Sequence, residues 1–142
     1  MKKFIIPLKV IELDTQSFHV IAEADINGIP LNLIIDTGAS RTVFDGETLE
    51  NFLRKAETYT KSIQSAGLMA DKIESKMAIA DHFVIGGLRL TDFPVILIDM
   101  NAIKDLYIKV TGTTIHGLLG SDFLLKMKST IDYKKLELVL RY

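Results

Sequence analysis

The sequence has no cysteine and no tryptophan, and its 142 residues include only three histidines and three prolines. The absence of cysteine excludes disulfides, thiol catalysis and thiolate metal sites. It also fits a reducing compartment, and we expect the protein to be cytoplasmic. Lys and Arg (17) nearly balance Asp and Glu (18), which gives a net charge of −1. Because no basic surplus is present, we expect neither nucleic acid nor a membrane as a partner.

Long apolar runs are also missing. The run at residues 4–8 stops at Lys9, which is too short for the roughly 7–15 apolar residues of a signal peptide core or the roughly 20 of a membrane span. We expect it to form the first β-strand instead. The composition, with 48% hydrophobic and 25% charged residues, is close to the globular average. The length favours a single domain over residues 1–142.

Apolar and polar residues alternate over much of the chain, which is typical of half-buried strands. The clearest example runs over residues 18–26 and is followed by Asn27-Gly28 and a second strand-like run at 29–35. Asn-Gly between two such runs is a strong hairpin signal, because both residues tolerate positive φ. The second run ends in Leu33-Ile34-Ile35, a pattern expected for a strand that is buried on both faces.

Further strands are expected along the rest of the chain, at residues 59–63, 72–79, 83–85, 88–90, 93–98, 115–119, 130–132 and 136–140. Gly86-Gly87 predicts another hairpin turn. The apolar spacing indicates short helices at 46–55 and 121–127, the second capped by Ser121 or Asp122, and one or two helical turns at 101–107. Many short strands with frequent turns predict an all-β barrel or sandwich.

One motif stands out from this background. The buried run of residues 33–35 leads directly into Asp36-Thr37-Gly38, followed by Ala39 and Ser40. A glycine permits a sharp turn, and a carboxylate at the end of a rigid strand is held in a fixed position. A bare Asp-Thr-Gly occurs by chance in roughly 3% of chains of this length, so the apolar residues before it and the small residues after it carry the signal.

In this context the sequence resembles the retropepsin-like aspartic protease family, in its single-domain bacterial or cellular form. The first family motif is matched at residues 34–40, and the second by Leu118-Leu119-Gly120 and the apolar segment after it. The resemblance covers residues 17–140. It implies a closed β-barrel of one lobe with one to three short helices, in which the two motifs are related by an internal pseudo-twofold.

The resemblance implies an aspartic endopeptidase without a cofactor or a metal. Such enzymes hydrolyse a peptide bond with a water held between two carboxylates, one acting as base and the other as acid. Asp36 supplies one carboxylate, and the aspartates at 45, 81, 92, 99 and 132 lack the Thr-Gly that follows it. A homodimer would supply the second Asp36. Thr37 would then bond across the dimer axis, and Gly38 would approach the substrate backbone.

The family pattern also assigns the contacts to a peptide or protein substrate. On the catalytic side these are Ala39, Ser40 and Val43. On the other side we expect a flap at residues 63–69 that contributes Ala66, Gly67 and Leu68, although a plain β-turn would give the same local pattern. A flap of this kind grips an extended peptide by adding it to a sheet.

The sequence departs from the viral members of the family at two positions. Ser121 stands where those enzymes typically carry an arginine, and Ser40 stands where they carry its acidic partner. Both halves of that ion pair are replaced together, so the resemblance implies neither the viral mode of dimerisation nor viral substrate preferences for this chain.

Two other functions remain open. A retropepsin-like fold could bind peptides or partners without cleaving them. A small β-barrel could bind nucleic acid, although the absence of a basic stripe argues against this. The three histidines lie far apart in the sequence and lack metal-ligand spacing; His19 is expected on the polar side of its strand.

Overall fold

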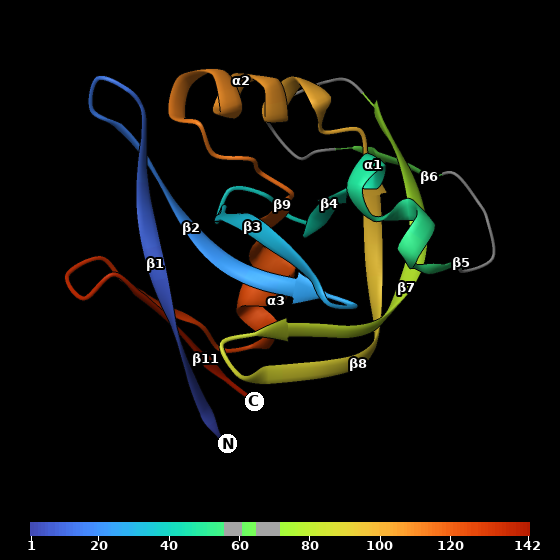
Figure 1. Cartoon of the computed structure of the whole chain (residues 1–142). Helices are drawn as coiled ribbons and strands as arrows, with labels where there is room; N and C mark the ends of the chain where they lie inside the picture. Colours follow the sequence, from blue (N-terminus) through green and yellow to red (C-terminus); the bar gives the residue numbers. More distant parts are fainter. Residues whose placement is uncertain (56–60, 65–71) are drawn as a thin grey trace.

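Six strands form a closed ring at the centre of the protein (Figure 1), whose computed structural model describes residues 1–55, 61–64 and 72–142. β7 closes the ring by pairing with β2 at Asp25↔Val84 and Ile26↔Phe83. In ring order the strands are β2 (Ser17–Ile26), β3 (Ile29–Ile35), β9 (Gly117–Leu119), β4 (Val43–Asp45), β8 (Leu88–Ile98) and β7 (Lys72–Ile85).

The remaining strands extend this ring. β1 (Lys3–Asp14) pairs with β2 and with β11 (Glu137–Arg141), and β10 (Thr130–Asp132) pairs with β11. β5 (Arg54–Lys55) and β6 (Lys61–Gln64) both pair with β7. The two chain ends lie side by side (Figure 1), since Lys2 and Tyr142 exchange backbone hydrogen bonds of 2.9 and 3.0 Å.

Helices are few and short. α1 (Gly46–Leu49) continues into the 3₁₀ turn η1 (Glu50–Phe52), and α3 (Ser121–Lys126) follows β9. The longest helix, α2 (Asn101–Thr111), lies along one end of the molecule, at the top of Figure 1. Within the described residues, no helix has the length and apolar character needed to cross a membrane.

The hydrophobic core has two parts. The larger part fills the ring and includes a cluster of aromatic rings in which Phe83 contacts Phe44, Phe93 and Phe123. The smaller part lies under α2 and contains Ile21, Ile34, Val43, Ile98, Met100, Tyr107 and Ile115. Along β3, Leu33 and Ile35 belong to the larger part and Ile34 to the smaller. The expectation that this strand is buried on both faces is confirmed.

The two glycine turns predicted from the sequence are confirmed. Asn27 and Gly28 have φ of 51° and 85°, and Gly86 and Gly87 have φ of 54° and 85°. The strands around the second turn are longer than expected, because β7 and β8 continue through Asp81 and Asp92. These two carboxylates are exposed and both bind Arg54, so the polar residues do not interrupt the strands.

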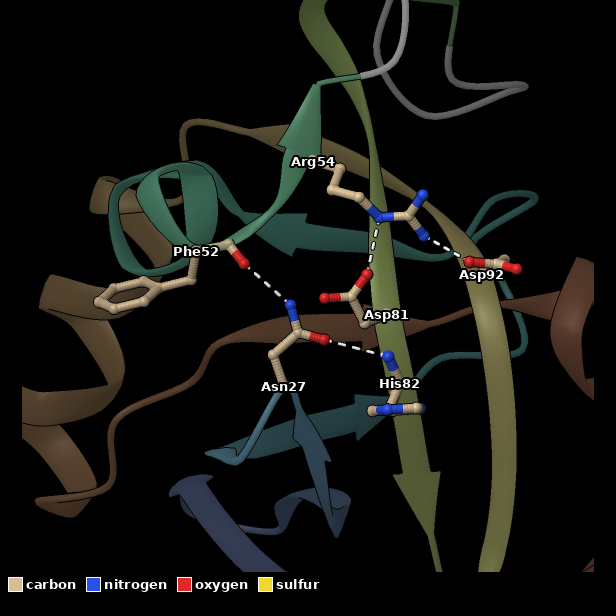
Figure 2. A network of polar contacts seen from close by, with 6 residues as sticks. All are labelled: Asn27, Phe52, Arg54, Asp81, His82 and Asp92. Atoms are coloured by element: carbon tan, nitrogen blue, oxygen red, sulfur yellow. Dashed lines mark hydrogen bonds and ion pairs between the residues drawn. The ribbon is translucent and has the colours of Figure 1, made fainter.

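The expected helix at residues 46–55 is wrong beyond η1. The backbone becomes extended at Leu53 (φ −111°, ψ 151°) and pairs with β7 as β5. Figure 2 shows the contacts that hold this segment: Asn27 Nδ2 donates to the Phe52 carbonyl (2.8 Å), and Arg54 reaches Asp81 and Asp92. These tertiary contacts override the local helical spacing.

The other two helices also differ from expectation. α2 is longer than the predicted turns and ends only where Gly112 takes a left-handed conformation, at φ 74°. The predicted cap of α3 is wrong. The N-cap position is Gly120, and no side chain caps the helix. Ser121 and Asp122 are the first two residues of the helix itself, and both also bond to residues 37–42, as shown below.

Asn27 provides a test of the bridge between the first hairpin and η1. Its side chain accepts from the His82 amide (3.0 Å) and donates to the Phe52 carbonyl. Asn27→Gly keeps the turn but loses both bonds, so we expect the free energy of unfolding to fall by about 1–3 kcal/mol. Asn27→Ala should lose a further 1–2 kcal/mol or so because of its positive φ. Urea unfolding measures both, and a glycine variant as stable as the original chain contradicts the bridge.

Candidate active site

The segment that carries Asp36 crosses over the end of a strand from the far part of the chain. β9 lies between β3 and β4, parallel to β3 (Leu33↔Gly117) and antiparallel to β4 (Val43↔Leu118). Residues 36–42 connect β3 to β4 and therefore pass over the end of β9. The Asp36 amide bonds to the Leu119 carbonyl at 3.0 Å, which fixes the start of the crossing.

A local turn orients the Asp36 carboxylate. Its Oδ1 accepts from the Gly38 amide at 3.0 Å, and its carbonyl accepts from the Ala39 amide at 3.1 Å. A β-carbon on residue 38 would lie only 3.3 Å from Oδ1, so glycine suits this position. Asp36 is half-buried, whereas Thr37, Gly38 and Ser40 are exposed. The turn thus holds a carboxylate in place and presents the next residues at the surface.

The second motif packs directly under this turn. A β-carbon on Gly120 would come within 2.8 Å of the carbonyl oxygens of Ala39 and Arg41, which only glycine avoids. Ser121 then donates from its amide to the Ala39 carbonyl (2.8 Å) and from its hydroxyl to the Thr37 carbonyl (2.7 Å). The serine that replaces the viral arginine therefore joins the two motifs by hydrogen bonds.

A buried threonine completes the junction. Thr42 donates from its amide and its hydroxyl to Asp122 Oδ1, at 2.9 and 2.7 Å, and its hydroxyl also accepts from the Gly120 amide at 3.0 Å. This pairing could not be predicted from the sequence, because the two residues lie 80 positions apart and neither residue type is unusual at its position.

The junction can be tested with a matched pair of variants. Thr42→Val keeps the shape of the side chain but leaves the Gly120 amide and one Asp122 bond unsatisfied, so we expect a loss of about 1–3 kcal/mol in the free energy of unfolding. Thr42→Ser retains the hydroxyl and serves as the control. Thermal and urea unfolding of the two variants measure the difference, and equal stability of the valine and serine variants argues against the junction.

Asp36 lines a cleft of about 230 Å³. The other lining residues come from β2, β3, α2 and β9, and they are His19, Ile34, Ile35, Ile103, Tyr107 and Leu118. Within the described part of the chain, Asp36 is the one carboxylate of this lining. Burial raises the pKa of Tyr107, and the nearby negative charge of Asp36 raises it further. The chemistry available here is therefore that of a single acid beside an apolar wall.

Comparison with known proteins shows which family has this arrangement of motifs. A family model described as Aspartyl protease matches residues 22–123, a span that includes both motifs. The chain belongs to the aspartyl protease family. No match among the curated proteins reached significance.

Similar chains are also found among solved structures. The crystal structure of a retropepsin-like aspartic protease from Rickettsia conorii is similar at 20% identity and a TM-score of 0.54, over 99% of this chain and 91% of that one. The retroviral protease-like domain of Ddi1 from Leishmania major aligns at 14% identity and a TM-score of 0.49, over 80% and 81% of the two chains. The fold expected from the sequence, an all-β retropepsin-like ring, is confirmed.

The expected site residues of this member of the aspartyl protease family fall into three groups. Asp36, Thr37, Gly38, Ala39 and Ser40 share the turn described above. Val43 is buried in the smaller core and does not line the cleft. The expected flap residues Ala66, Gly67 and Leu68 lie outside the described residues. On either side of that stretch, β6 pairs with β7 at Ser62↔Glu74 and Gln64↔Lys72.

Sequence reasoning missed the contribution of α2 to the cleft. It also placed His19 on a polar face, whereas His19 is half-buried and packs edge-on against Tyr107, with ring centroids 5.8 Å apart. The apolar spacing of Ile103 and Tyr107, four residues apart, was the signal that could have indicated a covering helix. Among residues 1–55, 61–64 and 72–142, no three acidic or histidine side chains gather in a way that could hold a metal ion.

A buried ion pair connects β4, the strand that follows the Asp36 turn, to α2. Asp45, at the end of β4, is fully buried, and its Oδ2 accepts from Lys104 Nζ (2.7 Å) and from the Thr48 hydroxyl (2.6 Å). Burial alone would raise the pKa of Asp45, but the bonds from Lys104 and Thr48 and the charge of Lys104 outweigh it, so this pKa is lowered.

This ion pair predicts a specific pH dependence. Because folding lowers the pKa of Asp45, its contribution to stability is complete above the unfolded value of about 4. That contribution is lost as the pH falls through the lowered folded value. Asp45→Asn should lower the free energy of unfolding at pH 7 by about 3–5 kcal/mol, since Lys104 loses its buried partner, and should flatten the acid limb of the stability curve.

The measurement is urea unfolding from pH 3 to pH 8. Lys104→Met is the matched control, because it removes the other charge of the pair. The double variant Asp45→Asn/Lys104→Met should recover part of the loss, since it leaves no unpaired charge. An Asp45→Asn variant with an unchanged acid limb contradicts the assignment of this limb to Asp45.

Proposed function

We propose that this aspartyl protease family member is an endopeptidase that acts as a homodimer, with one Asp36 from each subunit. The observation that carries the proposal is the oriented Asp36 carboxylate at the cleft, with Thr37 and Gly38 exposed beside it. Because the described lining of the cleft holds one carboxylate, a second copy is the natural source of the other.

The proposed reaction uses the two carboxylates as a pair. Two carboxylates about 3 Å apart share one proton, because like charges so close cannot both ionise easily. The charged member takes a proton from a bound water, and the protonated member donates to the carbonyl oxygen of the scissile bond. The attacking water forms the new C–O bond. The C–N bond breaks as the first carboxyl gives the proton taken from water to the leaving nitrogen, and a hydroxyl of the intermediate returns its proton to the second carboxylate as the carbonyl re-forms. The roles belong to the pair rather than to one subunit.

The neighbouring residues have supporting roles in this proposal. The exposed hydroxyl of Thr37 bonds across the twofold axis, and Gly38 admits the substrate backbone. Ala39 and Ser40 contact the peptide from one side, and Ala66, Gly67 and Leu68 from the flap, whereas Val43 supports the cleft from the core. An isologous contact of this kind places the same surface of each subunit against its copy, which the exposed position of the turn permits.

The proposal treats residues 1–142 as one catalytic domain in the cytoplasm. Its partners are a peptide or protein substrate and a second copy of the chain, with no nucleic acid, membrane or cofactor involved. These parts rest on the charge balance, the missing cysteines and the carboxylate chemistry described above.

Asp36→Asn tests the catalytic assignment. We expect it to reduce cleavage of an unfolded protein substrate by at least about 100-fold, because the amide can neither take nor give the proton. Asp105→Asn, which changes an exposed carboxylate on α2, is the matched control and should cleave normally. Cleavage that persists in Asp36→Asn overturns the role of Asp36.

The homodimer is tested by mixing. When equal amounts of the original chain and Asp36→Asn exchange subunits, about one quarter of the dimers carry two carboxylates in a symmetric pair, and activity should fall accordingly. Sedimentation at the same concentrations should show the dimer. Full activity from a monomer overturns this part, and a chain that binds peptides without cleaving them at any pH from 3 to 8 is a binding module instead.

A further inference from the structure

The cleft beside Asp36 has one wall that comes from outside the two family motifs. Ile34, Ile35 and Leu118 come from the strands on either side of Asp36, whereas Ile103 and Tyr107 come from α2. The lining is aliphatic apart from the Tyr107 and His19 rings and the carboxylate itself. An apolar wall facing a carboxylate suits a neutral side chain, because burying an unpaired charge is costly.

The geometry of α2 directs two of its residues into the cleft. Ile103 and Tyr107 are four positions apart and therefore lie on the same face of the helix. Tyr107 is 5% exposed, and its ring meets His19 edge-on at an interplanar angle of 73°. Because the ring is held by this contact and by the smaller core, its position in the cleft is fixed.

The helix itself is anchored to the catalytic segment. Lys104, next to Ile103, forms the buried bond with Asp45 at the end of β4, and β4 is the strand that follows the Asp36 turn. At the start of the helix, the Asn101 amide donates to Asp99 Oδ1 at 2.9 Å. The wall formed by α2 therefore has a defined position relative to Asp36.

We propose that Tyr107, on α2, determines how large a side chain the cleft beside Asp36 can take next to the scissile bond. The inference rests on the proposed function, since it names what the catalytic cleft accepts. The volume of about 230 Å³ is below the roughly 300–1,000 Å³ of pockets that hold a whole small molecule. A volume of this size suits a single side chain, and the Tyr107 ring forms part of the wall.

The test compares peptides that differ only at the scissile bond. Each has the same residue on both sides of the bond, either valine, leucine, phenylalanine or naphthylalanine, because a symmetric dimer presents the same subsite on each side. Tyr107→Leu opens the wall, and we expect the ratio of kcat/KM for the naphthylalanine peptide to that for the leucine peptide to rise at least about tenfold. Ile103→Phe narrows the cleft and should lower the same ratio.

Two controls separate the wall from the helix. Tyr107→Phe keeps the ring and should leave the size preference unchanged. Leu106→Ala changes a half-exposed residue of α2 that does not line the cleft, and it should also leave the preference unchanged. An unchanged ratio in both Tyr107→Leu and Ile103→Phe overturns the subsite, as does an equal shift in Leu106→Ala. If Tyr107→Leu does not fold, Ile103→Phe decides.

A binding measurement distinguishes failure of the subsite from failure of the proposed function. The same peptides with a reduced, uncleavable bond are titrated by calorimetry against the original chain and each variant. Binding that follows the expected size order without any cleavage supports the subsite and overturns the protease. Cleavage without a size shift overturns the subsite alone, and a chain that neither cleaves nor binds overturns both.

Discussion

The position of β9 between β3 and β4 is the constraint on which the rest of this protein depends. It forces residues 36–42 over the end of β9, where only glycine at position 120 leaves room for the crossing chain. The Asp36 turn is consequently fixed from below by the second motif and not only by its own hydrogen bonds. Ser121 and Asp122 bond across the junction, and Asp122 also accepts from the Phe123 amide of its own helix.

The same arrangement explains why the core has two parts. A strand that belongs to a closed ring has an inner and an outer face, and β3 uses both. The apolar side chains on the outer face are buried by packing against α2, which also lines the cleft beside Asp36. The same helix therefore covers the core and lines the cleft, and the buried Asp45–Lys104 pair connects it to the strand that follows the Asp36 turn.

Much of this fold could be predicted from the sequence, because its signals are local. Asn27-Gly28 and Gly86-Gly87 define two hairpins by their φ angles, and the run at 33–35 indicates a strand buried on both faces. The Asp36 turn and Gly120 were recognisable because residue type and order carry them. What could not be predicted depends on distant partners: Thr42 with Asp122, Asp45 with Lys104, and the bonds from Asn27 and Arg54 that end the helix at η1. No local pattern encodes a contact between residues 80 positions apart.

The pairing of the two chain ends has a consequence for how activity would be controlled. β1 and β11 pair with each other within one chain, and backbone hydrogen bonds between Lys2 and Tyr142 extend that pairing to the chain ends. Folding of these strands therefore does not wait for a second copy. In the proposed dimer, folding and association become separate steps, so a folded chain can accumulate without a complete pair of carboxylates. The amount of protein in the compartment, rather than the success of folding, would then decide when catalysis begins.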